Sequence, residues 1–179
     1  MVFDIFTLVE AIWIILPAFA ANGLVPILKG RHAIDGGRSF LDRPLFGPGK
    51  TWEGLLFGTM IGGAIAFIQQ LAHPYLPWNI SPVALNIIPM TIMLGLFLGF
   101  GAMFGDLIGS FLKRRFGLGR GRPAPLLDQE DFLLGALLFA SFVITLEISW
   151  VILLVVITPI VHWIASIIGY VLRIKREPW

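Results

Sequence analysis

The chain has 179 residues, of which 57% are hydrophobic and 13% charged, with a formal net charge of +2 and a mean hydropathy of +0.87. Charged residues make up about 25% of an ordinary soluble domain, so this composition excludes one and indicates a protein embedded in a bilayer. The chain contains no cysteine, which excludes a disulfide framework and thiolate metal sites.

The N-terminal segment predicts a retained membrane helix, because it carries Asp4 and Glu10 but no early lysine or arginine. It therefore lacks the basic region of a cleavable signal peptide. A membrane span needs about 20 mostly apolar residues. The last apolar run, from residue 132 to 172, is too long for one span and is divided by the polar stretch at Glu147. We expect five spans in one all-α transmembrane domain covering residues 1–179, at about 5–28, 54–71, 85–112, 128–147 and 150–172.

The basic residues predict the orientation in the membrane. All 13 lysines and arginines lie in three polar segments, within 29–50, 113–122 and 173–176. Five spans place the three segments on one side, whereas four or six spans would put the C-terminal segment on the opposite side. The positive-inside rule makes the shared side cytoplasmic and the N-terminus external. We therefore expect loops at about 29–53 and 113–127 to form an active site on the cytoplasmic face of the cell membrane.

The segment from 105 to 131 carries carboxylates at both ends. Asp106, Ser110 and Lys113 share one helical face, and Asp128 and Asp131 share another at the start of the next helix. Carboxylate and hydroxyl oxygens are the ligands that Mg²⁺ prefers. We predict that the three aspartates bind Mg²⁺ and, with Lys113, are catalytic. The alternative is that the second pair only enriches the first turn of a helix that follows two prolines.

The cluster Gly47-Pro48-Gly49-Lys50-Thr51 precedes the second helix and predicts an anion site, because free backbone N–H groups and the helix dipole point the same way. It is not a Walker A loop, since Pro44 stands where that pattern needs glycine. A simple helix-entry turn is the alternative. The full set of predicted nucleotide- or phosphate-binding residues is Asn22, Arg38, Gly49, Lys50, Thr51, Ser110, Arg114, Arg120 and Arg122. For Asn22, a hydrogen bond to a neighbouring helix is an equal alternative.

Small residues predict how the helices pack. Gly54, Gly58, Gly62 and Ala66 recur every four residues on the second helix, and glycines at 95, 99, 101, 105 and 109 repeat similar spacings on the third. Such spacings let helix backbones approach closely in lipid. The seam can lie within one chain or between chains, so the oligomeric state stays open.

Several segments together resemble the CTP-dependent phosphatidate cytidylyltransferases. Their signature is similar to Gly105-Asp106, Ser110, Lys113-Arg114, Leu127-Asp128 and Asp131, and their other recurring segment to Pro48–Gly54. The stretch from 16 to 43, with its Ile-Asp-Gly-Gly-Arg piece, looks more like the archaeal branch, whose members make CDP-archaeol. The likeness covers roughly residues 16–54 and 105–136. It departs from the bacterial and eukaryotic pattern at Gln129, where that pattern has arginine between the two aspartates.

The resemblance implies transfer of CMP from CTP to an unsaturated archaetidic acid (digeranylgeranylglyceryl phosphate), with release of pyrophosphate and a requirement for Mg²⁺. It implies metal binding by Asp106, Asp128 and Asp131, and phosphate binding by Lys50, Lys113 and Arg114. CTP, the lipid phosphate and membrane lipid are the expected partners, and no nucleic acid is expected.

Three other functions compete with this interpretation. A CDP-diacylglycerol synthase would use a diacyl lipid, and a CTP-dependent lipid kinase would transfer the γ-phosphate instead. A transporter would draw on Glu10, Glu147 and His162, because ionisable groups in spans are often functional. In the five-span scheme, however, the two glutamates lie near the outer interface, and the middle of the membrane is otherwise apolar.

Overall fold

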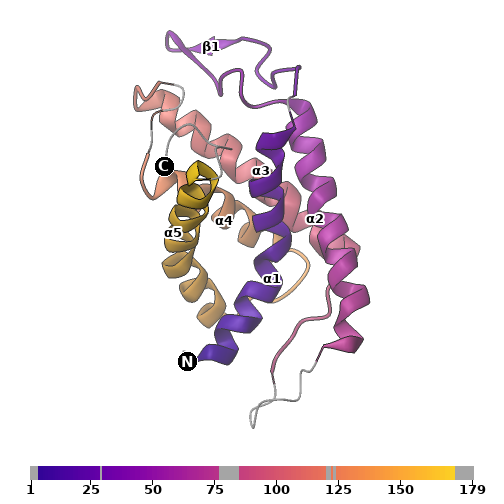
Figure 1. The fold of residues 1–179 in the computed structure, drawn as a ribbon. Helices are drawn as coiled ribbons and strands as arrows, with labels where there is room; N and C mark the ends of the chain where they lie inside the picture. Colours follow the sequence, from indigo (N-terminus) through magenta and orange to yellow (C-terminus); the bar gives the residue numbers. More distant parts are fainter. Residues whose placement is uncertain (1–3, 29, 77–84, 120–121, 123, 172–179) are drawn as a thin grey trace.

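The computed structural model describes residues 4–28, 30–76, 85–119, 122 and 124–171, and these form a helical bundle with one irregular loop at its end. The helices are α1 (Ile5–Leu24), α2 (Trp52–Ala72), α3 (Ile92–Arg115), α4 (Leu127–Ala140) and α5 (Ile148–Val171) (Figure 1). Short 3-10 turns follow α1 at Val25–Ile27 and α2 at His73–Tyr75. The prediction of a helical membrane protein is confirmed. The loop also contains an unpredicted two-stranded antiparallel pair, β1 (Ser39–Phe40) and β2 (Arg43–Pro44).

The bounds of the third and fourth helices differ from the sequence-based prediction. The third helix begins at Ile92 rather than near 85, because Pro89 disfavours helix before it and Thr91 caps the first turn by accepting from the Leu94 N–H at 3.1 Å. The fourth helix ends at Ala140 rather than near 147. At the other end, α3 continues to Arg115, so Lys113 lies on a helix rather than in a loop.

The length of α4 bears on the number of spans. Its 14 residues extend about 21 Å, which is less than the roughly 30 Å hydrocarbon core of a bilayer. Within the described residues, four helical segments are long and apolar enough to cross a membrane: Ile5–Ile27, Trp52–Tyr75, Ile92–Arg115 and Ile148–Val171. Length alone therefore supports four of the five predicted spans.

Helix α3 lies between α2 and α4, and glycines allow both contacts. A Cβ atom added at Gly62 of α2 would lie 2.7 Å from the Gly99 Cα atom of α3. On the other face of α3, a Cβ atom at Gly101 would lie 2.5 Å from the Gly135 carbonyl oxygen of α4. The predicted glycine seam is thus confirmed as a close backbone contact within the chain.

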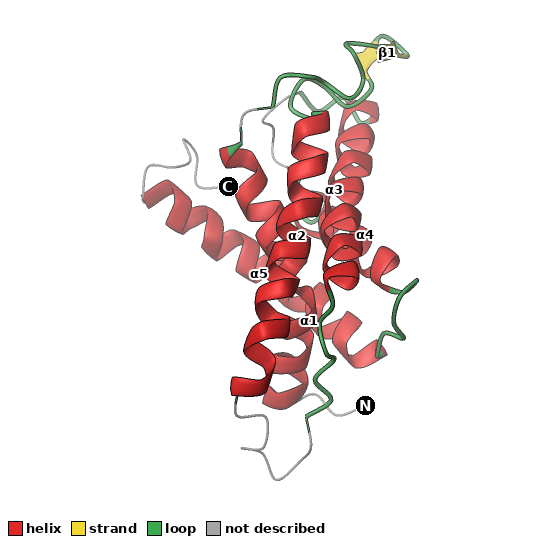
Figure 2. Ribbon diagram, turned by 90° about the vertical axis from the view of Figure 1, so that its right-hand side faces the viewer, coloured by secondary structure: helices red, strands yellow, loops and turns green. Residues whose placement is uncertain are grey.

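The two ends of the bundle differ in character. The loop of residues 30–51 covers the end where α3 finishes and α4 starts, as Figures 1 and 2 show. At the opposite end, Glu10 of α1 accepts hydrogen bonds from the Trp150 indole N–H of α5 at 2.9 Å and from the Asn86 backbone N–H. Asn86 in turn donates its amide to Glu147 at 2.6 Å. These two glutamates therefore hold α1, α5 and the segment before α3 together.

Candidate active site

The loop of residues 30–51 is tied to the start of α2 by backbone hydrogen bonds. The Ile34 N–H donates to the Lys50 carbonyl at 2.8 Å, and the Trp52 N–H donates to the His32 carbonyl at 3.0 Å. Thr51 caps α2, because its hydroxyl accepts from the Gly54 N–H at 3.1 Å. These bonds fix the backbone of Lys50 and so direct its side chain toward α3.

Asp35 organises the same loop from inside. Its buried carboxylate accepts three backbone N–H groups, from Gly37 at 2.9 Å, Phe46 at 3.1 Å and Gly47 at 2.8 Å. Burial opposes the charged form, but the hydrogen bonds from these N–H groups outweigh it and hold the pKa of Asp35 below its ordinary value of 3.8. Asp35 thereby fixes the turn that leads into Pro48-Gly49-Lys50.

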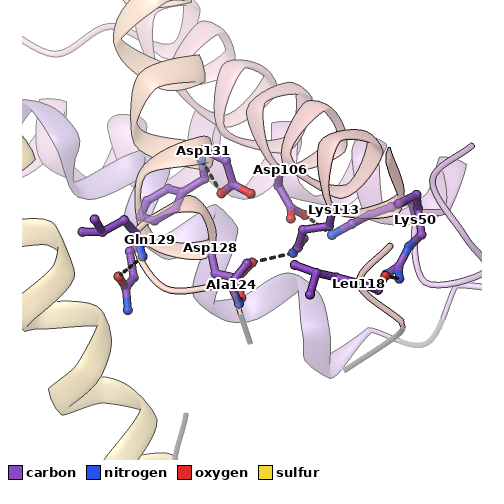
Figure 3. Close-up of polar contacts among 11 residues, drawn as sticks. Lys50, Asp106, Lys113, Leu118, Ala124, Asp128, Gln129 and Asp131 are labelled. Atoms are coloured by element: carbon purple, nitrogen blue, oxygen red, sulfur yellow. Dashed lines mark hydrogen bonds and ion pairs between the residues drawn. The ribbon is translucent and has the colours of Figure 1, made fainter. Parts of the chain in front are cut away.

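Two lysines meet two of the predicted aspartates at the end of α3 (Figure 3). The Lys50 ammonium pairs with Asp106, and the Lys113 ammonium lies 2.6 Å from Asp128 Oδ1. The second oxygen of Asp128 accepts from the Ala124 N–H at 2.9 Å. All four charged groups are partly exposed, so each ion pair can be exchanged for a ligand without uncovering a fully buried charge.

Asp131 differs from the other two aspartates. Its Oδ1 accepts from the Phe132 N–H at 2.6 Å, whereas its Oδ2 is buried and has no hydrogen-bond partner among the described residues. This carboxylate lies against Gly109, where an added Cβ atom would come within 2.7 Å of Asp131 Cγ. It is close enough to Asp106 for the two charges to interact. A buried orphan oxygen beside a second carboxylate is a position where a cation would be stabilised.

The donor chemistry of this region fits Mg²⁺. In the described part of the chain, no three acidic, histidine or cysteine side chains are already gathered tightly enough to hold a metal. Mg²⁺ commonly takes only one or two carboxylates from protein and completes its shell with water and substrate phosphate. Asp106 and the orphan oxygen of Asp131 match that requirement, and Asp128 lies nearby on the same turn of α4.

Two cavities flank the Pro48-Gly49-Lys50 segment, which lines both. The first has a volume of about 390 Å³ and lies among the ends of α1, α2 and α3; Asn22, Thr51, Asp106 and several apolar side chains line it. The second measures about 470 Å³ and lies between the loop and the end of α3; Ser110, Lys113 and Arg114 line it. Lys50 therefore stands at the boundary between the two cavities, and its partner Asp106 lines the first of them.

The structure separates the predicted basic residues into two groups. Lys50, Lys113 and Arg114 reach the cavities, although Arg114 also donates one hydrogen bond to the Leu118 carbonyl. Arg38 and Arg122 are exposed and are not among the residues that line these cavities. Arg120 lies outside the described residues.

Gln129 has a structural contact at the start of α4. Its side-chain oxygen accepts from the Leu126 N–H at 2.9 Å, which satisfies a free donor at the beginning of the helix (Figure 3).

Sequence reasoning missed Asp35, Arg43 and Arg115. The local signal for Asp35 was an Asp-Gly-Gly turn, which is typical of a side chain that hydrogen-bonds its own backbone two residues on. The bonds to Phe46 and Gly47 come from 11 and 12 residues away, and no local pattern announces them.

Replacing Asp35 by asparagine is expected to loosen residues 33–47, because an amide cannot accept all three N–H groups. The local cost is roughly 2 kcal/mol. Since the pKa of the folded carboxylate is depressed, its stabilisation is present above pH 3.8 and is lost as pH falls through the lower folded value. Amide hydrogen exchange of this segment against pH measures both effects. The exposed Asp42→Asn variant is the control, and equal exchange in the two variants would contradict the assignment.

The arrangement defines a multi-pass membrane protein with a polar, lysine- and carboxylate-lined site at one end of its helices. Residues 2–179 match the family described as CarS-like, CDP-archaeol synthase. The CDP-archaeol synthase of Thermococcus onnurineus is 44% identical over 97% of this chain and 98% of its own length, and that of Pyrococcus furiosus is 43% identical over 96% and 98%. A solved structure of an intramembrane enzyme for archaeal membrane lipids biosynthesis superposes with a TM-score of 0.75 at 37% identity, covering 89% of this chain and 94% of the other.

The chain belongs to the CDP-archaeol synthase family. The resemblance inferred from the motifs in the sequence is thereby confirmed over nearly the whole chain rather than over two segments.

Proposed function

We propose that this chain is a cytidylyltransferase that moves CMP from CTP onto an unsaturated archaetidic acid, yielding CDP-archaeol and pyrophosphate. The observation that carries the proposal is Lys50, which lines two adjoining cavities and pairs with Asp106 of the first, in a chain of this family. A reaction between two phosphates needs two adjoining anion sites with cations at their junction, and this arrangement supplies them.

The charge of the two cavities supports an assignment of substrates. The second cavity is lined by Lys113 and Arg114 in addition to Lys50, so it suits the triphosphate. Among the described residues that line the first cavity, Lys50 is the cation, with Asn22 and apolar side chains of the membrane helices around it. It suits a lipid phosphate whose chains stay in the bilayer.

The chemistry requires positioning and charge stabilisation more than proton transfer. An ionised oxygen of the lipid phosphate attacks the α-phosphorus of CTP, a new P–O–P link forms, and the bond to the β-phosphate oxygen breaks to release pyrophosphate. Lys50 and Lys113 orient the two phosphates and offset the charge that builds up between them. Asp106, Asp131 and Asp128 would hold Mg²⁺, which when bound supplies further neutralisation of phosphoryl oxygens.

We also propose five membrane crossings with the site on the cytoplasmic side. Helix α4 starts beside Lys113 at the loop end, whereas α5 starts beside Glu10 at the opposite end. The chain between them must therefore cross the bundle, with the segment 141–147 completing what the 14-residue α4 does not span. The basic residues of both loops then favour the cytoplasm for the loop end.

The test is incubation of purified protein with CTP labelled in the cytidine, Mg²⁺ and either the digeranylgeranyl ether-lipid phosphate or diacyl phosphatidic acid. We expect a labelled CDP-lipid and stoichiometric pyrophosphate from the ether lipid. Release of labelled CDP with a phosphorylated lipid would instead show a kinase. Equal turnover of the diacyl lipid would keep the reaction but remove the lipid preference, and failure to label either lipid would overturn the proposal.

A further inference from the structure

The loop and the end of α3 are joined by two arginines that each bond to the other's segment. The Arg115 guanidinium, at the end of α3, donates to the carbonyls of Phe40, Arg43 at 3.1 Å and Pro44 at 2.7 Å. In return, Arg43 of β2 donates to the carbonyls of Arg114 at 3.2 Å and Arg115 at 3.1 Å. Every one of these acceptors is a backbone oxygen, and none is a carboxylate.

Each guanidinium suits its position for a separate physical reason. Arg43 lies on the last carbonyls of α3, where free acceptors and the negative end of the helix dipole attract a cation. Arg115 lies between two aromatic rings, 5.4 Å from the centre of Phe40 and 5.2 Å from the centre of Phe111. A planar guanidinium can stack on both rings and still donate in its own plane, which an ammonium cannot do.

The contacts hold the two walls of the second cavity together. Strand β2 ends at Pro44, and the chain that follows it carries Phe46 and Gly47; these two residues and Arg43 line the cavity from the loop side. Lys113 and Arg114 line it from the α3 side. A ring contact between Phe46 and Phe111, with centroids 6.3 Å apart, adds an apolar link beside the arginines.

We propose that Arg43 and Arg115 form a reciprocal clasp that positions the loop over the triphosphate cavity, and that Arg115 is a positioning residue rather than a phosphate ligand. The assignment of the cavity to the triphosphate rests on the proposed function. Three contacts to backbone carbonyls occupy both terminal nitrogens of Arg115, and Arg115 is not among the residues that line the cavity, whereas Arg43, which uses one nitrogen for its two carbonyl bonds, also lines it. The clasp needs the fork shape of arginine as well as its charge, so a lysine, which keeps only the charge, does not replace it.

The first test compares Arg115→Lys with Arg115→Gln. If the clasp acts by geometry, both variants raise KM for CTP by a similar factor, roughly tenfold, because lysine keeps the charge but loses the paired carbonyl bonds and the stacking. A phosphate ligand would instead be largely preserved by lysine. Arg31→Gln removes an exposed charge from the same loop and is the control, with an expected change of less than about twofold.

The second test replaces the clasp between the loop and α3 by a covalent link that does not need the arginine. Because the chain has no cysteine, Phe40→Cys and Phe111→Cys introduce two unique thiols that a bis-maleimide can bridge. Bridging them in the Arg115→Gln background is expected to return KM for CTP to within about threefold of the bridged protein that retains Arg115. Rescue by lysine but not by the bridge would overturn the proposal.

A readout independent of catalysis separates this proposal from the proposed function. Amide hydrogen exchange over residues 39–47 is expected to rise at least about fivefold in Arg115→Lys and to stay unchanged in Arg31→Gln. Unchanged exchange in Arg115→Lys would overturn the clasp even in a fully active enzyme. If Arg115→Lys exchanges faster but the parent protein makes no CDP-lipid, the clasp proposal is supported and only the cytidylyltransferase assignment is rejected.

Discussion

Replacing Asp106 by asparagine is expected to lower kcat/KM for CTP by roughly 100- to 1,000-fold. The reason is that Asp106 is the only one of the three site aspartates that both pairs with Lys50 and lies beside the orphan oxygen of Asp131. Asparagine keeps the size and one oxygen but removes the charge that would attract a cation. Initial rates of CDP-lipid formation over a range of CTP and Mg²⁺ concentrations measure the loss.

The matched control is Asp42→Asn, which makes the same chemical change at an exposed position of the loop. Asp42 has a positive φ of 57°, a conformation that asparagine tolerates well, so no backbone strain is added. We expect its kcat/KM within about twofold of the parent protein. An Asp106→Asn variant that is folded and retains more than about a third of the parent activity would remove Asp106 from the reaction.

The sequence predicted the part of this site that follows from helical periodicity, namely which residues share one face of α3. Asp106, Ser110 and Lys113 share a face because α3 is a regular helix, and Ser110 and Lys113 do line the same cavity. The pairing of Lys113 with Asp128 could not be read from spacing, because it depends on how α3 and α4 cross. That crossing is set by glycines such as Gly105, where an added Cβ atom would lie 2.9 Å from the Asp131 carbonyl carbon.

The roles of the individual basic residues could not be predicted from the sequence. A cluster of arginines beside a phosphate site is typical of phosphate binding, and all of them look alike in the sequence. The structure distinguishes them by their acceptors. Lys50 and Lys113 pair with carboxylates, whereas Arg43 and Arg115 donate to backbone carbonyls about 70 residues away in the chain. Their partners are tertiary, so only the folded chain reveals them.

The predicted ends of the third and fourth helices were also wrong, because contacts of the folded chain keep two apolar segments out of the helices. The apolar run before Ile92 has the composition of a helix, but Trp13 of α1 donates its indole N–H to the Ile88 carbonyl at 3.1 Å, which engages a backbone oxygen of that run. The segment after Ala140 is equally apolar, yet it has to reverse direction so that α5 can begin beside Glu10. Hydropathy predicts that both segments are in the membrane and does not distinguish helix from irregular backbone.

Replacing Gly109 by alanine is expected to lower kcat at least about tenfold without unfolding the bundle. An added Cβ atom would lie 2.7 Å from Asp131 Cγ and 2.8 Å from Asp131 Cβ, so the carboxylate must turn away from its place beside Asp106. The nearest atom is the carboxylate oxygen Oδ2, which can rotate away, whereas the contact with Asp131 Cβ requires a small shift between α3 and α4. We therefore expect displacement of the site with a smaller loss of packing. Steady-state rates and thermal unfolding in detergent measure the two effects separately.

The control is Gly23→Ala, because Gly23 is also helical and an added Cβ atom there meets nothing within 4 Å. A double-mutant cycle with Asp131→Asn then tests the route of the effect. If Gly109 acts by seating the Asp131 carboxylate, the double variant is no slower than Asp131→Asn alone, since there is no longer a charged group to displace. Losses that multiply would show that the methyl group disturbs some other part of the site, and the orphan oxygen of Asp131 would lose its place among the proposed cation ligands.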